Sequence, residues 1–240
     1  METEGVRTDR LGLLLDHFDQ AREMAAVRLT GLGDEEYLWE PVPGCWSIRR
    51  RGEAATPRAY GPGEWVLDKG APDIPASEYA EVARQAAGGM TVARIAEDWS
   101  VGVERVEEVL AHTGEPDPDA PPVTTIAWRL GHLHSCFAGQ WEWIFGERRR
   151  EPGLLVDFTP SADLALERFW ALIDRWRESV GALTEEQLDT VGLSQYPHSN
   201  DADYPFAAVL TGSCLEFIHH MAEIGLLRDL WRARFGAPAS

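Results

Sequence analysis

The fold class is decided by residues 206–235, whose sequence is FAAVLTGSCLEFIHHMAEIGLLRDLWRARF. Apolar side chains recur in this stretch every three or four residues, close to the 3.6-residue period of an α-helix. The stripe consists of Ala207, Leu210, Cys214, Phe217, Met221, Ile224, Leu227 and Trp231. We therefore expect one long amphipathic helix over residues 206–235, with this stripe turned toward a core.

Three further stretches, residues 8–30, 123–145 and 161–181, show the same helical period of apolar side chains. Thr124 or Thr125 is a suitable N-cap for the second of them. Four amphipathic helices of this kind predict an all-α four-helix bundle. No run of strict apolar–polar alternation predicts a sheet.

The connection over residues 34–70 contains several prolines and glycines, which exclude a long helix. It also carries Trp39, Trp46 and Trp65. We expect a segment so rich in tryptophan to pack across the end of the helical body.

Residues 72–120 are expected to form an inserted subdomain within a single domain over residues 1–240. Short helices are predicted between residues 76 and 112, in an order similar to a helix-turn-helix unit. Its last helix carries Glu104, Glu107 and Glu108 against Arg105, which makes it a poor reader of the DNA major groove. A packing surface or a surface for a protein partner is the favoured interpretation.

The composition excludes several classes of protein. The formal net charge is 22 − 40 = −18, so binding to nucleic acid or to anionic lipid is not expected. The acidic start of the chain and the absence of a long apolar run predict a cytoplasmic protein with no membrane-spanning helix. Cys136 and Cys214 are interpreted as core thiols, and Cys45 as a thiol in an accessible turn.

The residues best suited to chemistry gather on the fourth predicted helix. Glu216 and His220 are four residues apart and share one helix face, and Glu223 lies one turn further on. A facing helix can complete a metal site with His132, whereas His134 is expected to point outward. The alternative from spacing alone is that these histidines are hydrogen-bonded boundary residues of the core.

Two segments, TIAWRLGHL at residues 125–133 and EFIHHMAEIGLLRDL at residues 216–230, together resemble the DinB-like (YfiT-like) superfamily. The segment YLWEPVPGCWS at residues 37–47 resembles the first crossover of its actinobacterial members. The likeness covers about residues 8–70 and 122–235 and leaves out the insert. It implies an up-down-down-up bundle that holds a divalent metal on three residues.

The resemblance also implies a ligand set and a chemistry. Typical members use three histidines; here His132 and His220 match two of them, and Glu216 stands at the third position. Zinc or nickel is then the expected metal, and the carboxylate also suits iron or manganese. Relatives that use mycothiol, bacillithiol or glutathione imply a thiol-dependent S-transferase or isomerase acting on a small electrophile.

In that interpretation the candidate catalytic residues are Glu223 and His17, and Arg228 is a candidate cofactor-binding residue. A homodimer is expected by the same resemblance. The alternative function is a non-catalytic, metal-containing helical protein whose insert recruits a protein partner.

Overall fold

A computed structural model describes residues 9–54, 59–68, 74, 78–99, 101–113, 123–148, 156–192 and 204–236. These residues contain eight α-helices and one two-stranded β-hairpin. The expectation of a mostly helical chain is confirmed. The prediction that no sheet forms is wrong, although the sheet is small.

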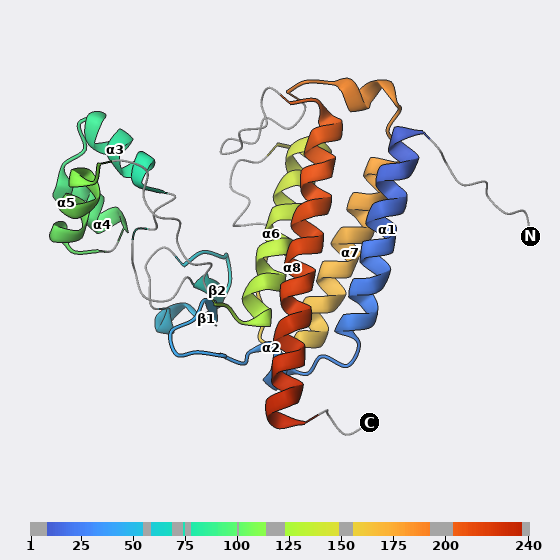
Figure 1. Ribbon diagram of the computed structural model, residues 1–240, viewed down its shortest axis with the longest axis horizontal. Helices are drawn as coiled ribbons and strands as arrows, with labels where there is room; N and C mark the ends of the chain where they lie inside the picture. The colour runs from blue at the N-terminus through green and yellow to red at the C-terminus, as the bar shows by residue number, and fades with distance from the viewer. Residues whose placement is uncertain are drawn as a thin grey trace, which may run out of the picture.

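Four long helices lie side by side and make up the main body (Figure 1). They are α1 (Arg10–Leu29), α6 (Ile126–Ile144), α7 (Ala162–Gly181) and α8 (Phe206–Phe235). Each begins and ends within three residues of the predicted range. Side chains of Asp9, Thr125 and Ser161 cap the first turns of α1, α6 and α7 by accepting backbone hydrogen bonds.

Two contacts between helix ends fix the relative direction of α1 and α7. The start of α1 meets the end of α7 where Glu185 accepts a hydrogen bond from the Leu11 amide. The start of α7 meets the end of α1 where Asp34 accepts one from the Ala162 amide. α1 and α7 are therefore antiparallel, and Figure 1 shows that α8 runs in the direction of α1 and α6 in the direction of α7.

An aromatic cluster fills the centre of the bundle. Phe18 of α1 lies 4.8 Å from Trp176 and 5.1 Å from Phe217, measured between ring centroids. Phe137 of α6 lies 5.1 Å from Trp176. All four helices thus contribute to one core, and full burial of such rings supplies much of the hydrophobic stabilisation.

The first connection contains α2 (Asp34–Tyr37) and the hairpin of β1 (Ser47–Arg50) and β2 (Trp65–Asp68), with a 3-10 turn at Arg51–Glu53. The strands are antiparallel, with Ser47 opposite Asp68. The hairpin packs against the first turns of α6, where Trp46 lies 4.9 Å from Trp128. Each strand has four residues, too few for alternation to stand out in the sequence.

The insert folds around a small core of its own. Its helices are α3 (Tyr79–Ala87), α4 (Val92–Trp99) and α5 (Val103–Ala111). Their buried side chains, including Val82, Ile95 and Val106, share no member with the core of the bundle. The predicted cap Ser77 and both ends of the predicted 72–120 boundary lie outside the described residues. The domain boundary stays a prediction.

A second connection, between α7 and α8, contains a 3-10 turn at Glu186–Asp189. None of the helices described is long and apolar enough to cross a membrane.

Candidate metal centre

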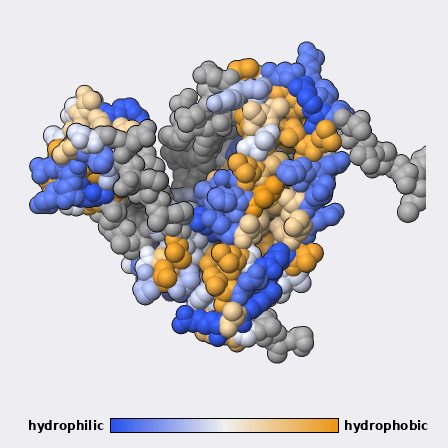
Figure 2. Space-filling view, in the orientation of Figure 1, coloured by the Kyte–Doolittle hydropathy of each residue, from blue (hydrophilic) through white to orange (hydrophobic). Residues whose placement is uncertain are grey.

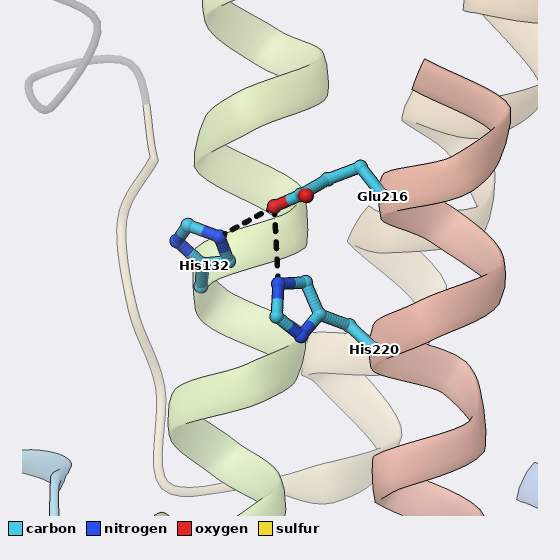
Figure 3. Close-up of side chains that lie close together, drawn as sticks. All are labelled: His132, Glu216 and His220. Carbon is cyan, nitrogen blue, oxygen red and sulfur yellow. Dashed lines mark hydrogen bonds and ion pairs between the residues drawn. The ribbon is translucent and has the colours of Figure 1, made fainter. Parts of the chain in front are cut away.

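The antiparallel pair α6 and α8 brings three predicted ligands together (Figure 3). His132 projects from α6 toward Glu216 and His220, which stand one turn apart on α8. One ligand atom from each residue lies within 4.8 Å of the other two. The predicted trio is therefore a spatial cluster and not only a sequence pattern.

Glu216 is the meeting point of the cluster. Its Oε1 atom lies 2.9 Å from Nε2 of His132 and 3.0 Å from Nε2 of His220. The hydrogen bond from His132 has the larger effect and the one from His220 the next. Together they hold the pKa of the Glu216 carboxyl well below its usual range. The ionised carboxylate is thus the stable form at neutral pH.

His220 is held at both ring nitrogens. Its Nδ1 atom lies 2.5 Å from Oε2 of Glu223, and its Nε2 atom faces Glu216. Ionised carboxylates only accept hydrogen bonds, so this arrangement favours a proton on each ring nitrogen and hence the charged form of the ring. Burial by itself lowers the pKa of His220, but the hydrogen bonds to Glu216 and Glu223 outweigh it and raise the pKa.

Two neighbours on α6 support this arrangement. Arg129 makes an ion pair with Glu223 at 3.0 Å, which fixes the carboxylate that orients His220. Trp128 stacks on the ring of His132 at 5.1 Å between centroids. Neighbouring side chains therefore hold both proposed ligand rings in place, as is general for the ligands of metal sites.

The trio fits a divalent metal ion. Both Nε2 atoms point at a single carboxylate oxygen, so an ion placed among them would replace the two hydrogen-bonding protons. Two histidines and one carboxylate form a known zinc set and also suit iron(II). Three protein ligands leave a fourth position open to another group.

A groove of about 210 Å³ opens beside the trio between α6 and α8. Its apolar wall includes Phe137, Ala208 and Val209. Its polar side contains Gln140 and Ser213, whose side chains lie 2.8 Å apart, and Gln140 also accepts from the Trp176 indole. Glu216 belongs to the same lining, so a small molecule in the groove would lie next to the cluster.

His17 is not part of this cluster. It lines a separate groove of about 590 Å³ between α1 and α8, together with apolar residues such as Met24 and Leu226. Figure 2 shows apolar side chains gathered over these two helices. The predicted catalytic residue His17 belongs to α1, and the groove that it lines lies along a different face of α8 from the trio.

Arg228 also lies away from the cluster. Its side chain is fully buried and forms an ion pair with Glu36 through Nε at 2.8 Å and Nη2 at 3.0 Å. Its Nη1 atom donates to the backbone carbonyls of Arg28 and Thr30. The guanidinium thus ties α8 to the end of α1 and is not exposed for gripping a cofactor.

The interpretation of two cysteines is corrected by the structure. Cys136 is exposed rather than a core residue, and its Sγ atom lies 3.6 Å from Nε2 of His132. Cys45 is buried rather than accessible. Cys214 is buried as expected. Desolvation raises the pKa of Cys45 and Cys214 to about 11. Desolvation, followed by the charge of Glu216, raises the pKa of Cys136 to about 12, so all three thiols are poor nucleophiles at neutral pH in the absence of a metal ion.

His134 does not point into solvent as expected. It is half-buried against α7, with its ring 6.1 Å from that of Phe169. Burial, followed by the nearby Arg168 and Arg175, lowers the pKa of His134 to about 4. It is therefore a neutral packing residue near neutral pH.

Three supporting residues were missed from the sequence: Trp128, Arg129 and Cys136. Trp128 and Cys136 lie four residues before and after His132, so the helical period places all three on one face. Arg129, three residues before His132, reaches the same face of the bundle. The signal was present, because a face that carries the predicted ligand His132 must also meet α8.

The chain was compared with known proteins. A family model described as the DinB superfamily matches residues 17–224. Searches of curated proteins and of solved structures found no match.

Proposed function

Because this chain belongs to the DinB superfamily, we propose that it is a metal-dependent enzyme acting on a small electrophile with a low-molecular-weight thiol. In this proposal His132, Glu216 and His220 hold the divalent ion. The observation that carries it is the convergence of two histidine Nε2 atoms on one oxygen of Glu216. Mycothiol, bacillithiol and glutathione are the thiols to test.

When bound, the ion would supply Lewis acidity that favours the thiolate form of such a thiol. Glu223 and Arg129 contribute by orientation. The Glu223 carboxylate keeps the Nδ1 proton on His220, so Nε2 is the nitrogen turned toward the ligand cluster. Arg129 in turn neutralises and positions Glu223. Glu223 is thus a positioning residue in this proposal.

The groove beside the trio is the proposed substrate site. Its volume of about 210 Å³ is below the range typical of drug-sized ligands and suits a small molecule. Phe137 and Val209 would cover an apolar part of the substrate, and Gln140 and Ser213 would offer hydrogen bonds to a polar part. Neither His17 nor Arg228 has a role in this site.

One activity assay tests both the proposed metal site and the proposed substrate groove. Metal-loaded protein is mixed with each thiol and an activated aryl chloride, and thiol consumption is followed against the protein-free rate. Gly212 lines the groove, and a Cβ added there would meet open space, so Gly212→Val should narrow the groove without disturbing the fold. We expect catalysis in the wild type, loss in His220→Ala, and a raised KM in Gly212→Val.

If metal-loaded wild type consumes no thiol faster than buffer does with any of these partners, the proposed thiol chemistry is refuted. Equal rates in the wild type and His220→Ala would refute the assigned site.

One observation favours the alternative of a binding protein. The insert has its own core, separate from that of the bundle, as a module for a protein partner would. A partner whose binding depends on the insert, together with a metal centre inert toward every thiol tested, would favour this alternative. The expected homodimer stays a prediction, which sedimentation at several concentrations can test.

A further inference from the structure

The thiol of Cys136 lies next to the ligand trio, and the proposed thiol chemistry gives it no role. Its Sγ atom lies 3.6 Å from Nε2 of His132 and 3.9 Å from Nδ1 of the same ring. Cys136 also lines the same groove as Glu216. The sulfur therefore lies beside one member of the trio, in the lining of the proposed substrate groove.

The placement of Cys136 repeats the pattern of α8. Glu216 and His220 are four residues apart on α8, and His132 and Cys136 are four residues apart on α6. Residues with this spacing share one helix face, so each of the two packed helices presents a pair of metal-ligating groups to the other. Two such pairs supply four ligands, the number that zinc takes in closed sites.

One distance and the charge agree with this pairing. With zinc–nitrogen and zinc–sulfur bonds of roughly 2.05 and 2.3 Å, a tetrahedral centre separates the two ligand atoms by about 3.6 Å. Cys136 Sγ and His132 Nε2 already lie at 3.6 Å. A thiolate and the Glu216 carboxylate would also cancel the charge of a divalent ion, which lowers the cost of holding it in a half-buried site.

We propose that Cys136 is the fourth ligand of the resting metal centre, completing a site of two histidines, one carboxylate and one thiolate. On binding, the sulfur–metal bond forms as the thiol proton is released to solvent, and no oxidation occurs. Cys136 is not among the residues whose ligand atoms all lie within 4.8 Å of one another, so its side chain must rotate about the Cα–Cβ bond to reach the ion. The inference rests on the proposed metal site and deepens it, because an external thiol must then displace an internal one.

This ligand set also favours particular metals. A soft thiolate favours zinc, whereas two histidines and a carboxylate alone accommodate manganese and iron as well. Replacing the sulfur of Cys136 with the hydroxyl of serine should therefore weaken zinc binding more than manganese binding. The cysteine would act as a determinant of metal specificity.

Cobalt(II) tests the proposal in the full-length protein after its metal is removed with a chelator. Thiolate ligation of cobalt gives a strong charge-transfer absorption in the near ultraviolet. We expect this band at one cobalt per chain in the wild type and its loss in Cys136→Ser, with the weaker ligand-field bands retained. Cys214→Ser, which changes a buried thiol of α8, is the matched control and should keep the band.

The outcomes separate this inference from the metal site itself. Cobalt bound at one per chain without the band, or a band that persists in Cys136→Ser, overturns the role of Cys136 and leaves the trio intact. Failure of the wild type to bind cobalt overturns both. If Cys136→Ser folds poorly, X-ray absorption of the zinc-loaded wild type decides: one sulfur at about 2.3 Å supports the proposal, and none overturns it.

Discussion

Glu223 lies 2.5 Å from Nδ1 of His220, and this contact turns the opposite nitrogen of the ring toward Glu216 at 3.0 Å. The contact links a residue outside the ligand trio to one inside it. It also gives Glu223 a measurable role that differs from ligation, because its loss should weaken a metal site without removing a ligand.

Substitution of Glu223 by glutamine tests that role. The amide can still lie beside His220 but lacks the charge that stabilises the Nδ1 proton, so metal affinity should fall by about 10- to 100-fold. Competition with a chromophoric chelator measures the affinity. Asp229→Asn is the control. It removes another carboxylate of α8, one that forms an ion pair with Arg28, and should leave the metal affinity unchanged. Equal affinities in Glu223→Gln and the wild type would contradict the positioning role.

The pKa of His220 predicts the pH dependence of metal binding. Its folded-state pKa is raised, so without metal its charged hydrogen bonds stabilise the fold below the ordinary histidine pKa. That stabilisation is lost as the pH rises through the raised value. A metal ion must displace the Nε2 proton, so its affinity increases with pH over the same range.

The rise in Tm caused by zinc should therefore grow from pH 6 to pH 8, as measured by thermal unfolding with and without the ion. His134→Ala, a control with no ligand role, should show the same growth. A zinc-induced shift that is constant or falls over this range would contradict the assignment of His220.

The buried ion pair between Arg228 and Glu36 predicts a large effect on stability. Arg228→Ala would leave the Glu36 carboxylate buried and unpaired, a change that costs about 3–5 kcal/mol. Chemical denaturation measures this loss. Because the two groups are coupled, the double variant Arg228→Met with Glu36→Gln should recover part of it. A loss below about 1 kcal/mol in Arg228→Ala would contradict the structural role.

The separate core of the insert predicts that it can be unfolded alone. Val106 is fully buried in that core, and Val106→Asp places an unpaired charge there. We expect loss of part of the helical circular dichroism signal while the bundle keeps its metal and its main unfolding transition. Loss of both together would show that the insert and the bundle fold as one unit.

Helical periodicity was enough to locate the long helices, because α1, α6, α7 and α8 each carry a continuous apolar stripe. It also placed Glu216 and His220 on one face. It could not tell which neighbouring helix a boundary position meets, so Cys136 was assigned to the core although its neighbour Phe137 is the core residue.

Long-range pairing explains the other differences. Arg228 follows Ile224 by four residues on the buried side of α8, and its partner Glu36 is 192 residues away. No local pattern reveals such an ion pair, so its charge suggested an exposed, ligand-gripping side chain. The positions of His17 and His134 likewise depend on which helices α1 and α6 pack against.

The most direct test of the account is the metal content of the purified protein after expression with added zinc and nickel. Elemental analysis should find about one divalent ion per chain in the wild type and almost none in His220→Ala. His219→Ala changes the adjacent histidine, which lies outside the trio, and should keep the ion. A metal-free wild type, or equal metal in the wild type and His220→Ala, would contradict the central claim.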